Sequence, residues 1–160
     1  MAQNQSAAMG ESASTATDDD GTARQMQVLE FELGEETYCV DIDYVSEIVD
    51  RGSLTSVPNA PPYVEGVMDL RGRTTSIVNP KTLLNVEGTV EPSRIVIFDA
   101  KQFADGAAVG WLVDEVDQVI RVSMEDVEEP PMDHGDFIEG IIRRDEGLVV
   151  WISPMKTADA

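Results

Sequence analysis

Cysteine and histidine each occur only once in this chain of 160 residues. A single cysteine excludes an internal disulfide framework and a multi-cysteine metal site. It is Cys39, which lies in a run of alternating apolar residues, so we expect a buried and unreactive thiol. The single histidine, His134, lies in a segment rich in Pro, Asp and Gly, where we expect it to be solvated. These two residues therefore predict no metal site.

The short motifs of common catalytic sites are also missing. No serine or cysteine lies in a nucleophile-elbow sequence, and there is neither a glycine-rich phosphate loop nor a His-Glu-x-x-His motif. Acid pairs such as Asp19-Asp20 are frequent, but a chain this acidic is expected to carry them on any solvated face. The segment Asp18–Gly21 lacks the spaced ligands and the closing Glu of a calcium loop. We expect no catalysis, no cofactor and no bound metal ion, which leaves an interaction protein.

Positive charge is scarce, because 11 Lys and Arg residues stand against 31 Asp and Glu residues, for a formal net charge of -20. Nucleic-acid binding needs a basic face for phosphate contacts, so this composition argues against it. Strong self-repulsion is screened only by salt, and such surfaces are typical of proteins from a high-salt cytoplasm. We therefore expect a halophilic source.

Long apolar runs are absent, and the N-terminal residues lack the basic and apolar blocks of a secretory signal. A cytoplasmic protein without direct membrane insertion is expected. Residues 1–24 are rich in Ala, Ser, Thr, Gln and acid and contain almost no large apolar side chain, which predicts a disordered acidic tail. Residues 156–160 are expected to form a short C-terminal tail.

Alternating apolar residues predict β-strands through most of the remaining chain. Residues 27–40 read as a hairpin with an acidic, Gly-containing turn. Residues 41–48 follow with a spacing of three to four that fits a helical turn begun by an Asp cap and leading into a short strand. Residues 52–62 contain three prolines and are expected to be a loop, and Pro80 is expected to begin a short helix.

An internal repeat organises the chain, because segments of its two halves match at a constant offset of 74 residues. The clearest match is Val64-Glu65-Gly66-Val67 with Ile138-Glu139-Gly140-Ile141. We therefore predict an all-β fold of two similar small barrels with short helical segments, packed side by side. Barrel one is placed at about residues 25–85 and barrel two at about 93–155, with approximate boundaries that allow interleaving.

The stretch Val64–Pro80 reads as a hairpin whose turn carries Arg71-Gly72-Arg73. Two readings of this arginine pair stay open: it is solvated or bridged to the acidic surface, or it contacts a partner. The second copy has Asp145-Glu146-Gly147 at the matching tip, and this opposite charge suggests that only one tip meets a partner.

Three strings of residues together resemble the CheW family of chemotaxis coupling proteins, over about residues 27–155. They are VLEFELGEETYCVDIDYVSEIV, VPNAPPYVEGVMDLRGRTTSIVNP and VGWLVDEVDQVI. The resemblance implies two SH3-like five-stranded β-barrels and a non-catalytic adaptor in a two-component system. It also implies two partners, the cytoplasmic tip of methyl-accepting chemoreceptors and the regulatory domain of the histidine autokinase CheA, with assembly into rings or arrays as a further implication.

The resemblance also implies site residues. It places the receptor in a groove between the barrels, in contact with Arg71 and with Val45 and Glu47 alongside. It assigns the kinase contact to apolar residues of the first barrel, namely Ile42, Ile48 and Leu29.

The residues themselves leave alternatives open. Ile42, Val45 and Ile48 also fit a core position, and Glu47 also fits a solvated acid. Asp69 and Pro80 depart from the usual family pattern, and Asp69 is expected to hold Arg71 in a local ion pair. A second functional hypothesis is a CheW-like paralogue that scaffolds a different two-component kinase. A third is a small-ligand binder or an acid-pair hydrolase.

Overall fold

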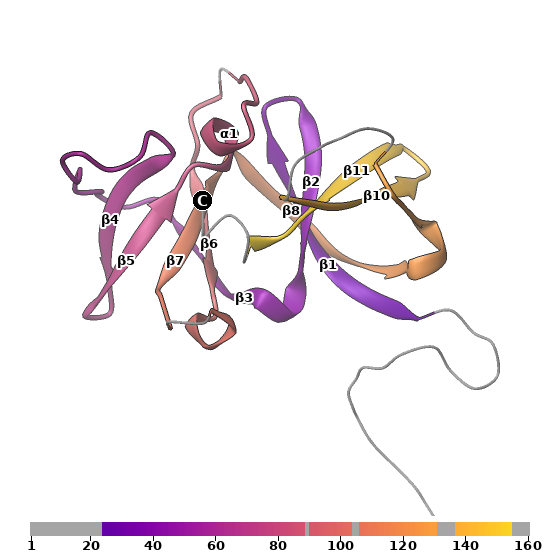
Figure 1. The fold of residues 1–160 in the computed structure, drawn as a ribbon, viewed down its shortest axis with the longest axis horizontal. Helices are drawn as coiled ribbons and strands as arrows, with labels where there is room; N and C mark the ends of the chain where they lie inside the picture. The colour runs from indigo at the N-terminus through magenta and orange to yellow at the C-terminus, as the bar shows by residue number, and fades with distance from the viewer. Residues whose placement is uncertain (1–23, 89, 104–105, 131–136, 155–160) are drawn as a thin grey trace, which may run out of the picture.

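The strands form two curved sheets that lie side by side, with a short helix at one end between them (Figure 1). This computed structural model describes residues 24–88, 90–103, 106–130 and 137–154. The elements of the first half are β1 (Gln25–Leu33), β2 (Glu36–Asp41), η2 (Ile42–Tyr44), β3 (Val45–Asp50), β4 (Val64–Leu70), β5 (Arg73–Val78) and α1 (Pro80–Leu83). Those of the second half are β6 (Arg94–Phe98), η3 (Ala100–Gln102), β7 (Val109–Val113), β8 (Glu115–Ser123), η4 (Met124–Asp126), β9 (Val127–Glu128), β10 (Ile138–Arg144) and β11 (Gly147–Ile152).

Each sheet takes strands from both halves of the chain. The six-stranded sheet has the order β8-β1-β2-β11-β10-β9, and the five-stranded sheet has the order β3-β6-β7-β5-β4. The hairpins β1–β2 and β6–β7 are therefore exchanged, each completing the sheet of the other half through a parallel pair, β2 with β11 and β7 with β5. The predicted all-β fold is confirmed, and the two sheets interleave strands from the halves 25–85 and 93–155, as the approximate boundaries allowed.

The 74-residue repeat is visible in the strands, because β10 and β11 begin 74 residues after β4 and β5. Its shared glycines, Gly66 and Gly140, lie where the ladder of each hairpin shifts register. A Cβ atom on Gly66 would lie 2.5 Å from the carbonyl oxygen of Thr55, which bridges to the neighbouring Val67. A Cβ atom on Gly140 would lie 2.7 Å from Cγ1 of Val127 in β9. The repeated glycine therefore admits an extra segment across the outer edge of each hairpin.

Period-two alternation places the two faces of the central strands in different cores. In β6, Ile95 and Ile97 face the interior of the five-stranded sheet, whereas Val96 and Phe98 face a core shared by both sheets. In β1, Val28 belongs to the interior of the six-stranded sheet and Phe31 to the shared core. Because both of its faces are covered, β6 reads as a nearly continuous apolar run.

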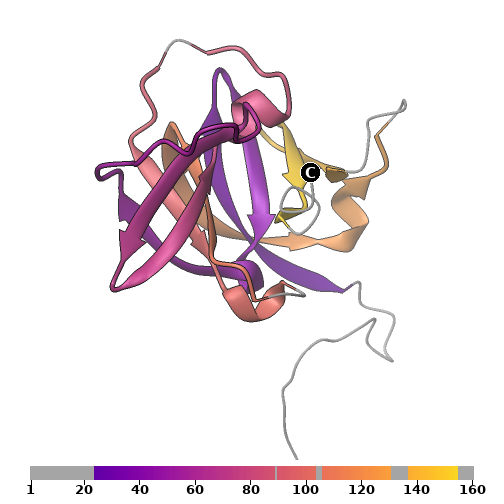
Figure 2. The same cartoon turned by 60° about the vertical axis from the view of Figure 1, so that its left-hand side comes forward.

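Aromatic rings join the two sheets in the shared core. Trp111 of β7 is fully buried, and its ring centroid lies 4.8 Å from that of Phe98 in a perpendicular arrangement. On its other side it lies 5.8 Å from the ring of Phe31, which comes from the six-stranded sheet. Such pairs contribute about 0.5–1.5 kcal/mol each beyond their buried area. The two sheets are thus packed as one body, as the view in Figure 2 also shows.

The predicted helical turn after β2 is present but short. Asp41 caps η2 by accepting a hydrogen bond from the backbone N–H of Asp43 at 2.9 Å. Beyond it, Val45 and Ile48 both pack against the shared core although they are three residues apart, because β3 contains a bulge between Val45 and Glu47. The bulge produces the spacing that reads as helical in the sequence.

Two further predictions concern the described chain directly. Cys39 is fully buried, and burial raises the pKa of its thiol, as expected for an unreactive cysteine. Within the ranges that the structure describes, no helix is both long and apolar enough to cross a bilayer. The predictions on His134, on Asp18–Gly21 and on the two tails concern residues 1–23, 131–136 and 155–160, which lie outside the described residues.

Candidate functional site

The site begins at the turn of the β4–β5 hairpin, which consists of Arg71 and Gly72. Their φ angles are 52° and 85°, the left-handed conformations that a two-residue hairpin turn needs. The carboxylate of Asp69 accepts a hydrogen bond from the Gly72 backbone N–H at 2.8 Å. The expected ion pair between Asp69 and Arg71 is therefore wrong, since Asp69 stabilises the turn and the guanidinium of Arg71 points to another carboxylate.

That carboxylate belongs to Glu47 in β3, which forms an ion pair and a hydrogen bond with Arg71. β3 and β4 are the two edge strands of the five-stranded sheet, so the pair links elements at opposite edges. The side chain of Arg71 is 68% exposed and that of Glu47 is 28% exposed. Arg71 is therefore bridged to an acidic group, as the first reading predicts, and its guanidinium is still exposed at the surface.

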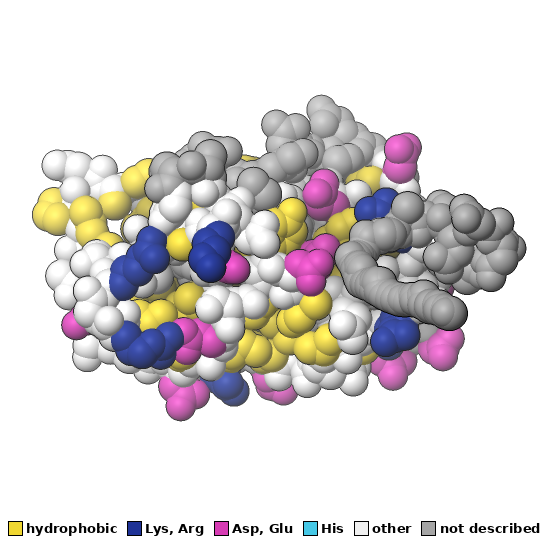
Figure 3. Space-filling view, turned by 90° about the horizontal axis from the view of Figure 1, so that it is seen from below, with side chains coloured by type: hydrophobic (Ala, Val, Ile, Leu, Met, Phe, Trp, Pro, Cys, Tyr) yellow, Lys and Arg dark blue, Asp and Glu magenta, His cyan; other side chains and the backbone are white. Residues whose placement is uncertain are grey.

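A groove with a volume of about 350 Å³ lies beside this pair. Arg71, Glu47 and Leu70 line one part of it, and Arg73 and Lys101 line the rest of its charged rim. Figure 3 shows basic side chains around an apolar hollow on this face of the molecule. All the lining residues come from the five-stranded sheet, from η3 and from their connections, so this groove does not lie between the two sheets as the resemblance implied.

The predicted apolar contact residues fall into two groups. Ile42, Val45 and Ile48 are half-buried and pack against the shared core, which leaves part of each side chain at the surface near η2 and β3. Leu29 is only 2% exposed and lies inside the shared core. A side chain without exposed surface cannot contact a partner, so the predicted kinase contact of Leu29 is wrong and the residue acts in packing.

A buried ion pair between Lys81 and Asp114 was not anticipated from the sequence. Lys81 Nζ lies 2.7 Å from Asp114 Oδ1, and the two side chains are 9% and 3% exposed. The second carboxylate oxygen of Asp114 accepts a hydrogen bond from the Gly34 backbone N–H at 2.8 Å, at the β1–β2 turn. The cluster therefore joins α1, the end of β7 and the exchanged hairpin. The available signal was a lysine inside the short helix that Pro80 begins, facing an acid directly after a fully apolar strand.

A pocket of about 230 Å³ on the six-stranded sheet collects carboxylates from several strands. Glu30 and Glu32 of β1 and Asp117 of β8 line it, together with Arg144 at the end of β10. A side-chain hydrogen bond with Asp117, then burial and the negative charge of Asp117, raise the pKa of Glu32 from 4.5 to about 7. Glu30 has other partners, since it accepts a hydrogen bond from Gln118 at 3.0 Å and lies 3.7 Å from Arg144.

The raised pKa of Glu32 gives a testable pH dependence. Because folding favours the protonated carboxyl, its contribution to stability is full below pH 4.5 and is lost as the pH rises through about 7. We expect Glu32→Gln to flatten the fall in unfolding free energy over this window by about 1 kcal/mol, a value reduced for solvent screening. Urea denaturation between about pH 5 and pH 8 measures it. Glu35→Gln, on the exposed turn of the same hairpin, is the control, and equal slopes for the two variants would contradict the prediction.

The comparisons with known proteins agree with this fold. The sequence profile of the CheW-like domain matches residues 27–160. The chain belongs to the CheW family. It is 32% identical over 136 residues to the chemotaxis protein CheW of Treponema pallidum, covering 79% of this chain and 78% of that protein. It is 33% identical over 117 residues to CheW of Rhizobium meliloti, covering 73% and 74%.

A solved CheW structure is similar as well. The scaffolding protein TtCheW from Thermoanaerobacter tengcongensis superimposes with a TM-score of 0.72 at 30% identity, over 81% of this chain and 84% of that one. As a CheW-family protein, the chain is a chemotaxis coupling scaffold and not an enzyme. The acid pair Glu32–Asp117 is therefore not a hydrolytic site, and the paralogue hypothesis is not favoured.

Proposed function

We propose that this CheW-family chain couples the cytoplasmic tips of chemoreceptors to the regulatory domain of CheA. The observation that supports it most directly is the exposed guanidinium of Arg71, held by Glu47 at the rim of an open groove. Guanidinium offers several donors in a fixed plane, so a group that already binds one carboxylate can still bind a partner. The proposed receptor contact consists of Arg71, of Glu47 and of Val45, which begins the strand β3 that contains Glu47.

The proposed kinase contact lies on the neighbouring surface around η2 and β3. Ile42 and Ile48 expose part of their apolar side chains there while their remaining atoms pack on the shared core. Half-buried apolar residues on a rigid support suit a protein interface, because little side-chain freedom is lost on binding. A single rigid body that carries both surfaces can bind the receptor and the kinase at the same time. The same proposal includes the assembly of further receptors and kinases into rings or arrays in the cytoplasm.

Reconstitution with purified components tests this function. We expect the chain to form separate complexes with a receptor cytoplasmic fragment and with the CheA regulatory domain, and a ternary complex when all three are mixed. Analytical ultracentrifugation measures each complex. Binding of only one partner, or mutually exclusive binding, would contradict a coupling role. Loss of directed swimming in a deletion strain is the matching result in cells, and unchanged swimming would instead favour a different two-component kinase as partner.

A further inference from the structure

Most lysines and arginines in the described ranges pair with a carboxylate. Their pairs are Arg51–Glu91, Arg71–Glu47, Lys81–Asp114, Arg94–Asp50, Arg143–Glu128 and Arg144–Glu30. Arg24, Arg73, Lys101 and Arg121 have no carboxylate partner among the described residues. Two of these four, Arg73 and Lys101, line the same groove beside Arg71. Half of the uncommitted positive charge in the described chain therefore lies in this groove, although the net charge of the chain is -20.

The two carboxylates that line this groove are already engaged. Glu47 is paired with Arg71. Asp99 caps η3 by accepting a hydrogen bond from the Lys101 backbone N–H at 3.0 Å. Arg73 uses one nitrogen to donate to the carbonyl oxygen of Gly106 at 2.5 Å, which fixes the guanidinium while leaving its other N–H groups free. The groove therefore has spare basic donors, whereas each of its two carboxylates already accepts a hydrogen bond.

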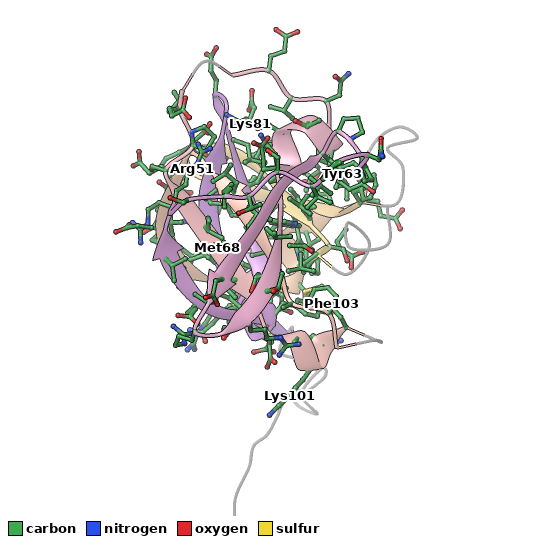
Figure 4. The ribbon with its side chains drawn as sticks, turned by 90° about the vertical axis from the view of Figure 1, so that its left-hand side faces the viewer. Arg51, Tyr63, Met68, Lys81, Lys101 and Phe103 are labelled. Atoms are coloured by element: carbon green, nitrogen blue, oxygen red, sulfur yellow. The ribbon has the colours of Figure 1, made fainter. Side chains whose placement is uncertain are left out.

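Packing beneath η3 holds Lys101 outward. Phe103, just after η3, is 7% exposed, and its ring centroid lies 6.3 Å from that of Phe98 in the shared core. Figure 4 shows the labelled Lys101 extending beyond the end of the molecule, with Phe103 above it on the inner side. Its side chain is exposed, as is that of Arg73 on β5. This packing fixes the position of η3, from which the Lys101 side chain extends.

We propose that Arg73 and Lys101 bind carboxylate side chains of the protein that docks in this groove, an acidic segment of the chemoreceptor tip. The inference rests on the proposed receptor function and adds the chemistry of recognition. An acidic partner is repelled by most of this surface, so attraction at the basic rim of the groove sets where it docks and in which orientation. Arg73 supplies a forked donor for one carboxylate and Lys101 a point charge for another.

The test compares two double charge reversals in the full chain. Arg73→Glu with Lys101→Glu removes the rim, and Arg24→Glu with Arg121→Glu is the matched control, since these cations are also exposed and without a carboxylate partner in the described chain. We expect the rim variant to bind a receptor cytoplasmic fragment at least about tenfold more weakly than wild type and to lose most of the salt dependence of binding. The control is expected to stay within about threefold, and both variants to bind the CheA regulatory domain as wild type does.

The possible results distinguish a failure of the proposed carboxylate site from a failure of the proposed receptor-coupling function. A wild-type chain that binds no receptor fragment overturns both. A wild-type chain that binds, with rim and control variants weakened equally, overturns the carboxylate site and leaves the receptor function standing. If the rim variant binds the receptor fragment as tightly as wild type does, the receptor does not use this rim and the proposed occupant is wrong. Arg73→Gln with Lys101→Gln repeats the comparison without added negative charge.

Discussion

Replacing Asp114 by alanine is expected to lower the free energy of unfolding by about 3–5 kcal/mol. The change leaves the ammonium group of Lys81 without its carboxylate in a site where the lysine side chain is only 9% exposed. It also removes the acceptor of the Gly34 N–H at the turn of the exchanged hairpin. Both losses fall on the junction of the two sheets, so we expect a single cooperative transition that moves to lower urea concentration.

Urea denaturation followed by circular dichroism measures this effect. Glu91→Ala is the matched control, because it breaks the Arg51–Glu91 pair, whose acid is 86% exposed, and should change stability by no more than about 1 kcal/mol. Combining Lys81→Met with Asp114→Leu replaces both charges by apolar groups and should recover most of the loss. Similar effects of Asp114→Ala and Glu91→Ala would show that the buried pair is not a special stabilising contact.

Arg71→Glu is expected to weaken binding of a receptor cytoplasmic fragment at least about tenfold, or about 1.4 kcal/mol. The substitution removes the exposed guanidinium and places a second carboxylate beside Glu47. The ion pair at the rim of the groove is thereby replaced by two carboxylates that repel each other. Binding to the CheA regulatory domain should stay unchanged, because its proposed contacts are Ile42 and Ile48. Isothermal titration calorimetry with each partner measures both expectations.

A charge swap separates a direct contact from a structural effect. Adding Glu47→Arg to Arg71→Glu restores an ion pair between the two edges of the sheet with reversed polarity. If receptor binding stays weak in the double variant while its thermal stability returns, the partner contacts the Arg71–Glu47 pair directly. Recovery of binding would mean that Arg71 acts only by holding β3 and the hairpin together. Full affinity in the single variant would refute its assignment to the receptor contact.

Local patterns in the sequence predicted most elements, because each depends on residues close together in the chain. Gly34 and Gly72 identified the two hairpin turns of the first half, and Pro80 identified the short helix. The exchange of hairpins was not predictable in the same way. Strands such as β6 and β7 are buried on both faces, and a continuous apolar run does not say which neighbours will cover it.

The candidate site shows the same division. The turn residues predicted that Arg71 lies at an exposed hairpin tip, and this prediction needs only the residues next to it in the sequence. The groove depends on η3 and on Lys101, which come from the other half of the chain and reach the site only through the exchanged β6–β7 hairpin. Leu29 was misplaced for a related reason, since an apolar residue in a predicted strand can face either a partner or a neighbouring sheet. Only the tertiary structure distinguishes the two.

The crossing of β1–β2 and β6–β7 between the sheets also limits how such a protein can be divided. Cleavage in the connection between α1 and β6 would give two fragments, each lacking the central hairpin of its own sheet and carrying that of the other. Neither fragment contains a complete barrel, so neither the proposed receptor surface nor the proposed kinase surface is expected to form in one fragment alone. We therefore expect neither fragment to fold on its own.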